Sequence, residues 1–131
     1  MKKTKKKNVL QSLSEMRKKP FFLIVTLLAT LVLVLTVILP LWRLFPEVQD
    51  RSAIPLHYNI YFGVDQFGPW ERLFTIPILG CIILIINTII AIVIWPRDRV
   101  LSYAFSGVSL IAQIFLLLAM IFVTLINLSY A

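Results

Sequence analysis

Three long runs of apolar residues dominate the pattern of hydrophobic and polar positions along this chain. No charged residue occurs in 21–41, in 73–95 or in 100–131. Each run exceeds the roughly 20 residues that a helix needs to cross a hydrocarbon core of about 30 Å. The pattern predicts an all-α membrane protein with transmembrane helices at about 21–44, 73–95 and 100–128 and a structured extracytoplasmic loop at 46–68.

The segment 1–20 precedes this three-span membrane domain, 21–131, and is basic. Within it, Val9, Leu10, Leu13 and Met16 recur at helical spacing, which favours an amphipathic helix lying on the membrane surface. A basic tail without secondary structure is the alternative, because an isolated helix of about 12 residues is marginal in water. The first apolar run is too long for the core of a signal peptide, so we interpret it as an uncleaved anchor.

Prolines and caps mark the ends of the predicted helices. Pro40 should either kink the first span or stop it. Pro69 is expected at the first helical position of the second span, with Glu71 in the first turn. Pro77 should then kink that span or divide it from a short interfacial segment at 69–74. Asp98 is a candidate cap for the third span.

Charge adds an orientation. The chain carries a formal charge of +7, and eight of its 13 basic residues precede the first span: Lys2, Lys3, Lys5, Lys6, Lys7, Arg17, Lys18 and Lys19. With Arg97 and Arg99, one side of the membrane holds ten basic residues against three on the other, which are Arg43, Arg51 and Arg72. The positive-inside rule then predicts a multi-pass protein of the plasma (inner) membrane, with its N-terminus inside and its C-terminus outside.

Composition agrees with a membrane location, since 60% of the residues are hydrophobic and the mean hydropathy is +0.91. The basic segment is interpreted as a topology signal and an anchor to anionic lipid. Nucleic-acid binding is not expected, because no aromatic residues interleave the lysines and no binding fold follows.

Catalytic chemistry has little support in the sequence, so the protein is not expected to be an enzyme. No charged or imidazole side chain falls within the membrane core of a span, although proton and ion pathways usually need one. A single histidine, His57, and a single cysteine, Cys81, fall short of a metal site, and no cofactor is expected. A subunit of an oligomeric transporter or channel remains the alternative function, since three helices are too few to enclose a pore.

Polar residues within the spans are predicted to pack helices together. Ser106, Ser109 and Gln113 lie on one stripe of the third span, and Asn87 lies at similar depth on the second. Small and polar residues on facing helices allow close approach and hydrogen bonds between spans. We therefore expect Asn87 to reach the third span, while a lipid or ligand site is the alternative.

The outer loop contains the second group of candidate residues. Polar and apolar positions alternate through 57–62, which predicts a short extended stretch lying on the bilayer surface. His57 is expected to hydrogen-bond to Asp65 or to backbone, and glycines are expected to supply positive φ at turns. The loop should therefore be ordered.

The same loop resembles a known bacterial membrane module, domain of unknown function 1648, which occurs at the N-terminus of SdpI-like immunity and signalling proteins. The residues that carry the resemblance are Pro55, His57, Tyr58, Asn59, Gly63 and Asp65. The chain departs from the module's pattern by one additional residue between Asn59 and Gly63. The resemblance implies an extracytoplasmic motif without a catalytic residue. The resulting hypothesis is a non-catalytic accessory, immunity-like or signalling protein that contacts a membrane-protein partner or a second copy of itself.

Overall fold

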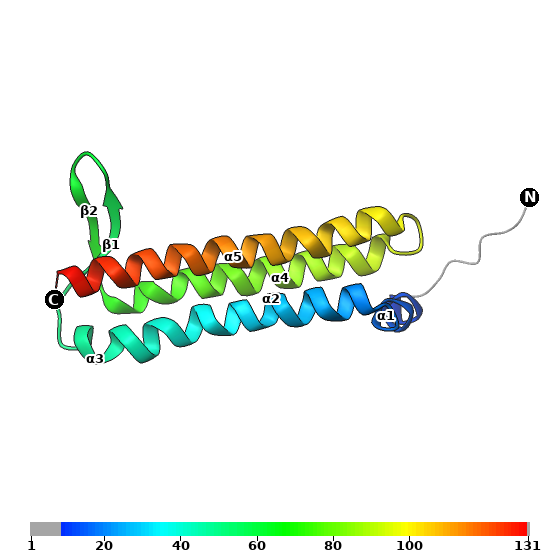
Figure 1. Ribbon diagram of the computed structural model, residues 1–131, viewed down its shortest axis with the longest axis horizontal. Coiled ribbons are helices and arrows are strands. Elements are labelled where there is room, and N and C mark those ends of the chain that lie inside the picture. The colour runs from blue at the N-terminus through cyan, green and yellow to red at the C-terminus, as the bar shows by residue number, and fades with distance from the viewer. Residues whose placement is uncertain (1–8, 131) are drawn as a thin grey trace, which may run out of the picture.

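The computed structural model describes residues 9–130 and is mostly helical (Figure 1). The lysines at positions 2–7 lie outside this range. In chain order the elements are α1 (Val9–Arg17), α2 (Pro20–Leu39), the π-helical turn η1 (Pro40–Leu44), α3 (Phe45–Val48), β1 (Ile54–Asn59), β2 (Gly63–Gly68), the 3-10 helix η2 (Trp70–Phe74), α4 (Thr75–Ile94) and α5 (Arg99–Ser129).

Three helical stretches lie side by side along the long axis of the molecule (Figure 1). They cover Pro20–Val48, Trp70–Ile94 and Arg99–Ser129, and each is long and apolar enough to cross a membrane. α5 packs against both α2 and α4 and holds most of the buried polar side chains. The prediction of a three-span, multi-pass membrane protein is confirmed at this level.

Pro40 does not stop the first span. The chain passes through the π-helical turn η1 and stays helical to Val48, beyond the predicted end near residue 44. Proline has no N–H to donate, and a π-turn accommodates the missing bond without ending the helix. The first residues of the expected outer loop, 46–48, are therefore helical.

The second stretch begins with a separate short helix, as one of the two alternatives predicted. Pro69 is the extended N-cap of η2, with ψ of 152°, and is not its first helical residue. α4 begins only at Thr75, so Pro77 lies in its first turn. The N–H groups of a first turn have no partner within the helix, so a proline there costs no hydrogen bond. The predicted cap of the third span is confirmed, since Asp98 Oδ1 accepts from the N–H of Leu101 at 3.0 Å.

α1 lies across one end of the bundle, together with the turn at 95–98; we call this the basic end (Figure 1). Met16 is buried there against Phe22 and Trp95, and the indole N–H of Trp95 donates to Glu15 at 3.2 Å. The N-terminal segment is thus helical from Val9. Leu10 stays 78% exposed, so α1 keeps an apolar edge free of the bundle.

At the other end, the hairpin end, β1 and β2 form an antiparallel pair that projects sideways from the bundle (Figure 1). The described chain is therefore not all-α. The expected extended stretch, 57–62, is extended only as far as Asn59 in β1, and its second half, 60–62, forms the turn that leads into β2. A cluster of buried side chains packs the base of the hairpin onto the helices: Leu44, Val48, Ile54 and Leu73.

Candidate functional site

One face of the hairpin gathers most of the residues singled out in the loop. Pro55 pairs with Phe67 and Asn59 pairs with Gly63, and side chains alternate between faces along each strand. Pro55, His57 and Asn59 therefore share a face with the β2 positions 63, 65 and 67. Tyr58 pairs with Val64 and lies on the opposite face.

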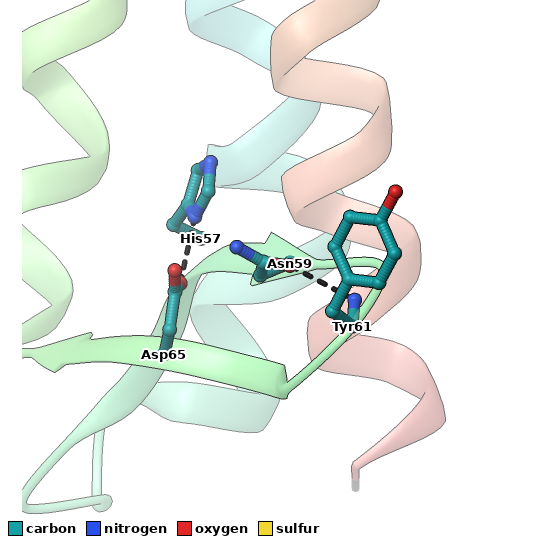
Figure 2. A network of polar contacts seen from close by, with 4 residues as sticks. All are labelled: His57, Asn59, Tyr61 and Asp65. Atoms are coloured by element: carbon teal, nitrogen blue, oxygen red, sulfur yellow. Dashed lines mark hydrogen bonds and ion pairs between the residues drawn. The ribbon is translucent and has the colours of Figure 1, made fainter.

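A hydrogen bond between side chains joins the two strands near the middle of this face (Figure 2). Nδ1 of His57 lies 2.7 Å from Oδ1 of Asp65, and the carboxylate is the acceptor. His57 pairs with Gln66 in the ladder, and the register shifts on both sides of His57, so its side chain meets Asp65 across an irregular part of the pairing. The predicted contact is present, with the imidazole side chain 61% exposed.

The turn of the hairpin is fixed by a side-chain contact and a glycine. Oδ1 of Asn59 accepts from the N–H of Tyr61 at 2.9 Å, which is an Asx turn (Figure 2). Gly63 has φ of 75°, in the left-handed region where a side chain is strained. The expectation of positive φ fails for Gly68, whose role is close packing: a Cβ there would lie 2.7 Å from Cδ1 of Leu56.

A hydrogen bond from the bundle holds the base of the hairpin. Nδ2 of Asn127, on α5, donates to the carbonyl oxygen of Pro55 at 2.6 Å, and both residues are buried. This contact was not expected from the sequence. The only signal for it was that Asn127 continues the polar stripe of the third span.

The tip of the hairpin is the most exposed apolar surface of the loop. Ile60, Tyr61 and Phe62 are 82%, 87% and 83% exposed. In Figure 2 the ring of Tyr61 and the imidazole of His57 both point along α5, away from the C-terminal end of that helix. The tip and the face that carries His57 and Asp65 together form the candidate site.

The polar stripe of α5 makes a second group of contacts, inside the bundle. Gln113 is fully buried, and its Nε2 donates to the carbonyl oxygen of Gly80 at 2.9 Å. Ser106 donates to the carbonyl of Ser102 in its own helix, while Ser109 is buried without a hydrogen-bond partner for its hydroxyl. Of the three predicted stripe residues, Gln113 is thus the one whose side chain forms a hydrogen bond to another span.

The expected contact of Asn87 with the third span is not formed. Asn87 is half-buried and makes no side-chain hydrogen bond within the described part of the chain. The buried face of α4 contains Gly80 and Ala91, and Asn87 lies at its edge. Near Ala91, α4 and α5 are joined instead by Ser102, whose hydroxyl donates to the carbonyl oxygen of Ala91 at 2.8 Å.

Within residues 9–130, no group of three or more His, Cys, Asp or Glu side chains is arranged to hold a metal ion. Cys81 is a free, exposed thiol on α4. The candidate site therefore offers surface contacts and hydrogen bonds. Among the residues described, its one close pair of ionisable groups is His57 and Asp65.

Comparison with protein-family models, with curated proteins and with solved structures gives no match for this chain. The resemblance to domain of unknown function 1648 therefore rests on the loop residues alone.

Proposed function

We propose that this chain is a non-catalytic accessory protein of a bacterial plasma membrane, of immunity-like or signalling type, whose hairpin binds another membrane protein. The observation that carries the proposal is the hairpin itself. It is held at its base by Asn127 and packed core residues, and it presents an apolar tip that residues 9–130 leave uncovered. The resemblance of the same residues to the module of immunity and signalling proteins supports this role.

The proposed location puts the hairpin at the outer surface and the basic end inside. The charge bias of ten basic residues to three supports this orientation. The hairpin projects sideways from the spans (Figure 1), so it would run along the bilayer surface. Aromatic side chains such as Tyr61 and Phe62 are favourable at that level, where one part of the ring meets lipid and another meets water.

A partner that lies in the same membrane fits this arrangement best. An apolar tip beside the polar face of His57 and Asp65 matches the usual composition of a contact surface, with an apolar centre and a polar rim. Because the hairpin extends beyond the bundle, the partner would meet the tip without displacing a span. The alternative, a subunit of an oligomeric transporter or channel, would place a second copy of this chain at the same position.

Site-specific photo-crosslinking in native membranes tests the proposal. A photoreactive residue at position 61 should give a stoichiometric adduct with one heterologous membrane protein. The same residue at position 122, which replaces the exposed Phe122 of α5, is the matched control and should label lipid. Ile60→Ser with Phe62→Ser should abolish the position-61 adduct, and His57→Ala should reduce it, while membrane insertion stays intact.

Each other outcome has a defined meaning. An adduct between two copies of this chain at position 61 would support the transporter or channel alternative. An adduct with lipid alone would overturn binding through the hairpin. A heterologous adduct that survives the double tip variant would also contradict the proposed role of the tip.

A further inference from the structure

A cavity of about 240 Å³ lies between α1, α2, α4 and α5 near the basic end. Its floor is formed by buried side chains from all three spans, among them Val25 and Ala29 of α2, Ala91 of α4 and Ser109 of α5. A dry apolar cavity of roughly 150 Å³ is already large enough to bind benzene. This cavity can therefore hold a substantial apolar group.

The rim of the cavity faces the surroundings of the spans. Leu23, Thr26 and Leu27 line it on α2, and all three are exposed. The lining extends along α2 from Phe22 to Ala29, about 10 Å at a rise of 1.5 Å per residue. The cavity is thus a slot that runs along the helix axes, and acyl chains run in this direction within a leaflet.

Positive charge lies at the end of the slot. Arg17 lines the cavity, and an adjoining shallow hollow is lined by Arg17 and Lys18 and shares Leu13 and Leu23 with it. Neither lining includes an Asp or Glu side chain among the residues described. Arginine and lysine side chains at this level favour a phosphate group over a neutral head group.

We propose that this slot binds one acyl chain of an anionic phospholipid, with the phosphate held by Arg17 and Lys18. An empty slot would forfeit the dispersion contacts that its lining atoms make with a chain. The occupant is a lipid of the leaflet in which the basic end lies, because the slot runs along the spans and its rim opens toward the bilayer. The inference does not depend on the role of the hairpin or on the orientation of the protein.

Lipid photolabelling in vesicles tests the proposal. The full chain is reconstituted with phosphatidylglycerol that carries a photoreactive acyl chain, and labelled peptides are identified by mass spectrometry. Label should concentrate on 22–29 of α2 and 84–92 of α4. Ala29→Phe fills the floor and should reduce this label to the level found at lipid-facing positions. Ala104→Phe introduces the same side chain at an exposed position near the same end and should leave the label unchanged.

A second variant keeps the test independent of packing in the core. Arg17 is exposed, and Arg17→Gln should reduce the preference for phosphatidylglycerol over phosphatidylcholine about fivefold, as expected for one basic residue at a membrane surface. Label spread evenly over the exposed positions of the spans would overturn the proposal. Equal labelling by both lipids in the unmodified chain would remove the role of the charge.

Discussion

At the residue scale, the value of a buried polar side chain depends on whether it finds a partner in another element. Gln113 reaches the backbone of α4 at Gly80, where the absence of a side chain allows the approach. A Cβ at Gly80 would lie 2.8 Å from Oε1 of Gln113 and 2.9 Å from Cδ1 of Leu33. Among the glycines described, Gly80 is therefore the one at which all three spans come closest together.

The first prediction compares two polar residues of the spans. Gln113→Leu should lower the free energy of unfolding in bicelles by about 1 kcal/mol, because it removes a hydrogen bond between spans whose worth is limited by partners in the unfolded state. Asn87→Leu should change it by less than about 0.5 kcal/mol, because Asn87 makes no such bond. Equal losses for the two variants would contradict the assignment of Gln113 as the bridging residue.

The second prediction concerns the turn of the hairpin. Gly63→Ala should destabilise the turn by about 1 kcal/mol, because alanine is strained at a φ of 75° although nothing lies within 4 Å of the added Cβ. Gly63→Asn is the matched control, since asparagine adopts the left-handed region more readily. Amide exchange of 54–68 would report the change. Faster exchange in both variants to the same extent would show that the side chain, and not φ, matters.

The sequence predicted which polar residues of the third span share a face, but it did not predict their partners. The stripe on the third span follows from spacing, because helical periodicity fixes which side chains share a face. The contact of His57 with Asp65 was expected only as one of two alternatives, because the pairing of the two strands was not predicted. The partner of a stripe residue does not follow from spacing. It depends on the rotation of α4 about its own axis, which places Gly80 and Ala91 against α5 and leaves Asn87 at the edge.

At the element scale, the hairpin is a small sheet that depends on the bundle for its order. A two-stranded hairpin alone is marginal in water, and this one gains support where Ile54 is buried and where Pro55 accepts from Asn127. Alternation predicted an extended stretch at 57–62, which is right for 57–59 in β1 and wrong for 60–62, where the chain turns. The pairing with 63–68 was not predicted, because the turn at 60–62 carries apolar residues in place of the usual turn signals.

The third prediction separates this support from the hairpin's own contacts. Asn127→Ala should increase amide exchange at the base, around 54–56 and 66–68, because it breaks the only side-chain hydrogen bond between the hairpin and the bundle among the residues described. Ser129→Ala is the control, since its hydroxyl is exposed and bonds only to the carbonyl of Leu125 in the same helix. Exchange confined to the tip in Asn127→Ala would mean that packing alone holds the base.

At the scale of the whole molecule, the two ends of the bundle differ in chemistry. The basic end joins α1 to the spans through Trp95 and a group of stacked rings that includes Phe22 and Tyr103. The hairpin end carries the apolar tip. The sequence was sufficient for the three spans and the charge bias, because length and apolar content decide whether a helix can span a bilayer. It was not sufficient for the slot at the basic end, which exists only because of how four helices pack.

The last prediction tests the proposed orientation through the charges that motivate it. Reporter fusions after Lys19 and within 96–99 should behave as cytoplasmic, and a fusion within 49–68 should behave as external. Replacing the five lysines at positions 2–7 with glutamine leaves five basic residues on the inner side against three, so the orientation should persist. Replacing Arg17, Lys18 and Lys19 as well leaves two against three, and the protein should then insert in both orientations or in reverse. As a control, glutamine at Arg43, Arg51 and Arg72 should leave the fusion signals unchanged. A cytoplasmic signal from 49–68 in the unmodified chain would overturn the orientation and place the hairpin on the inner surface.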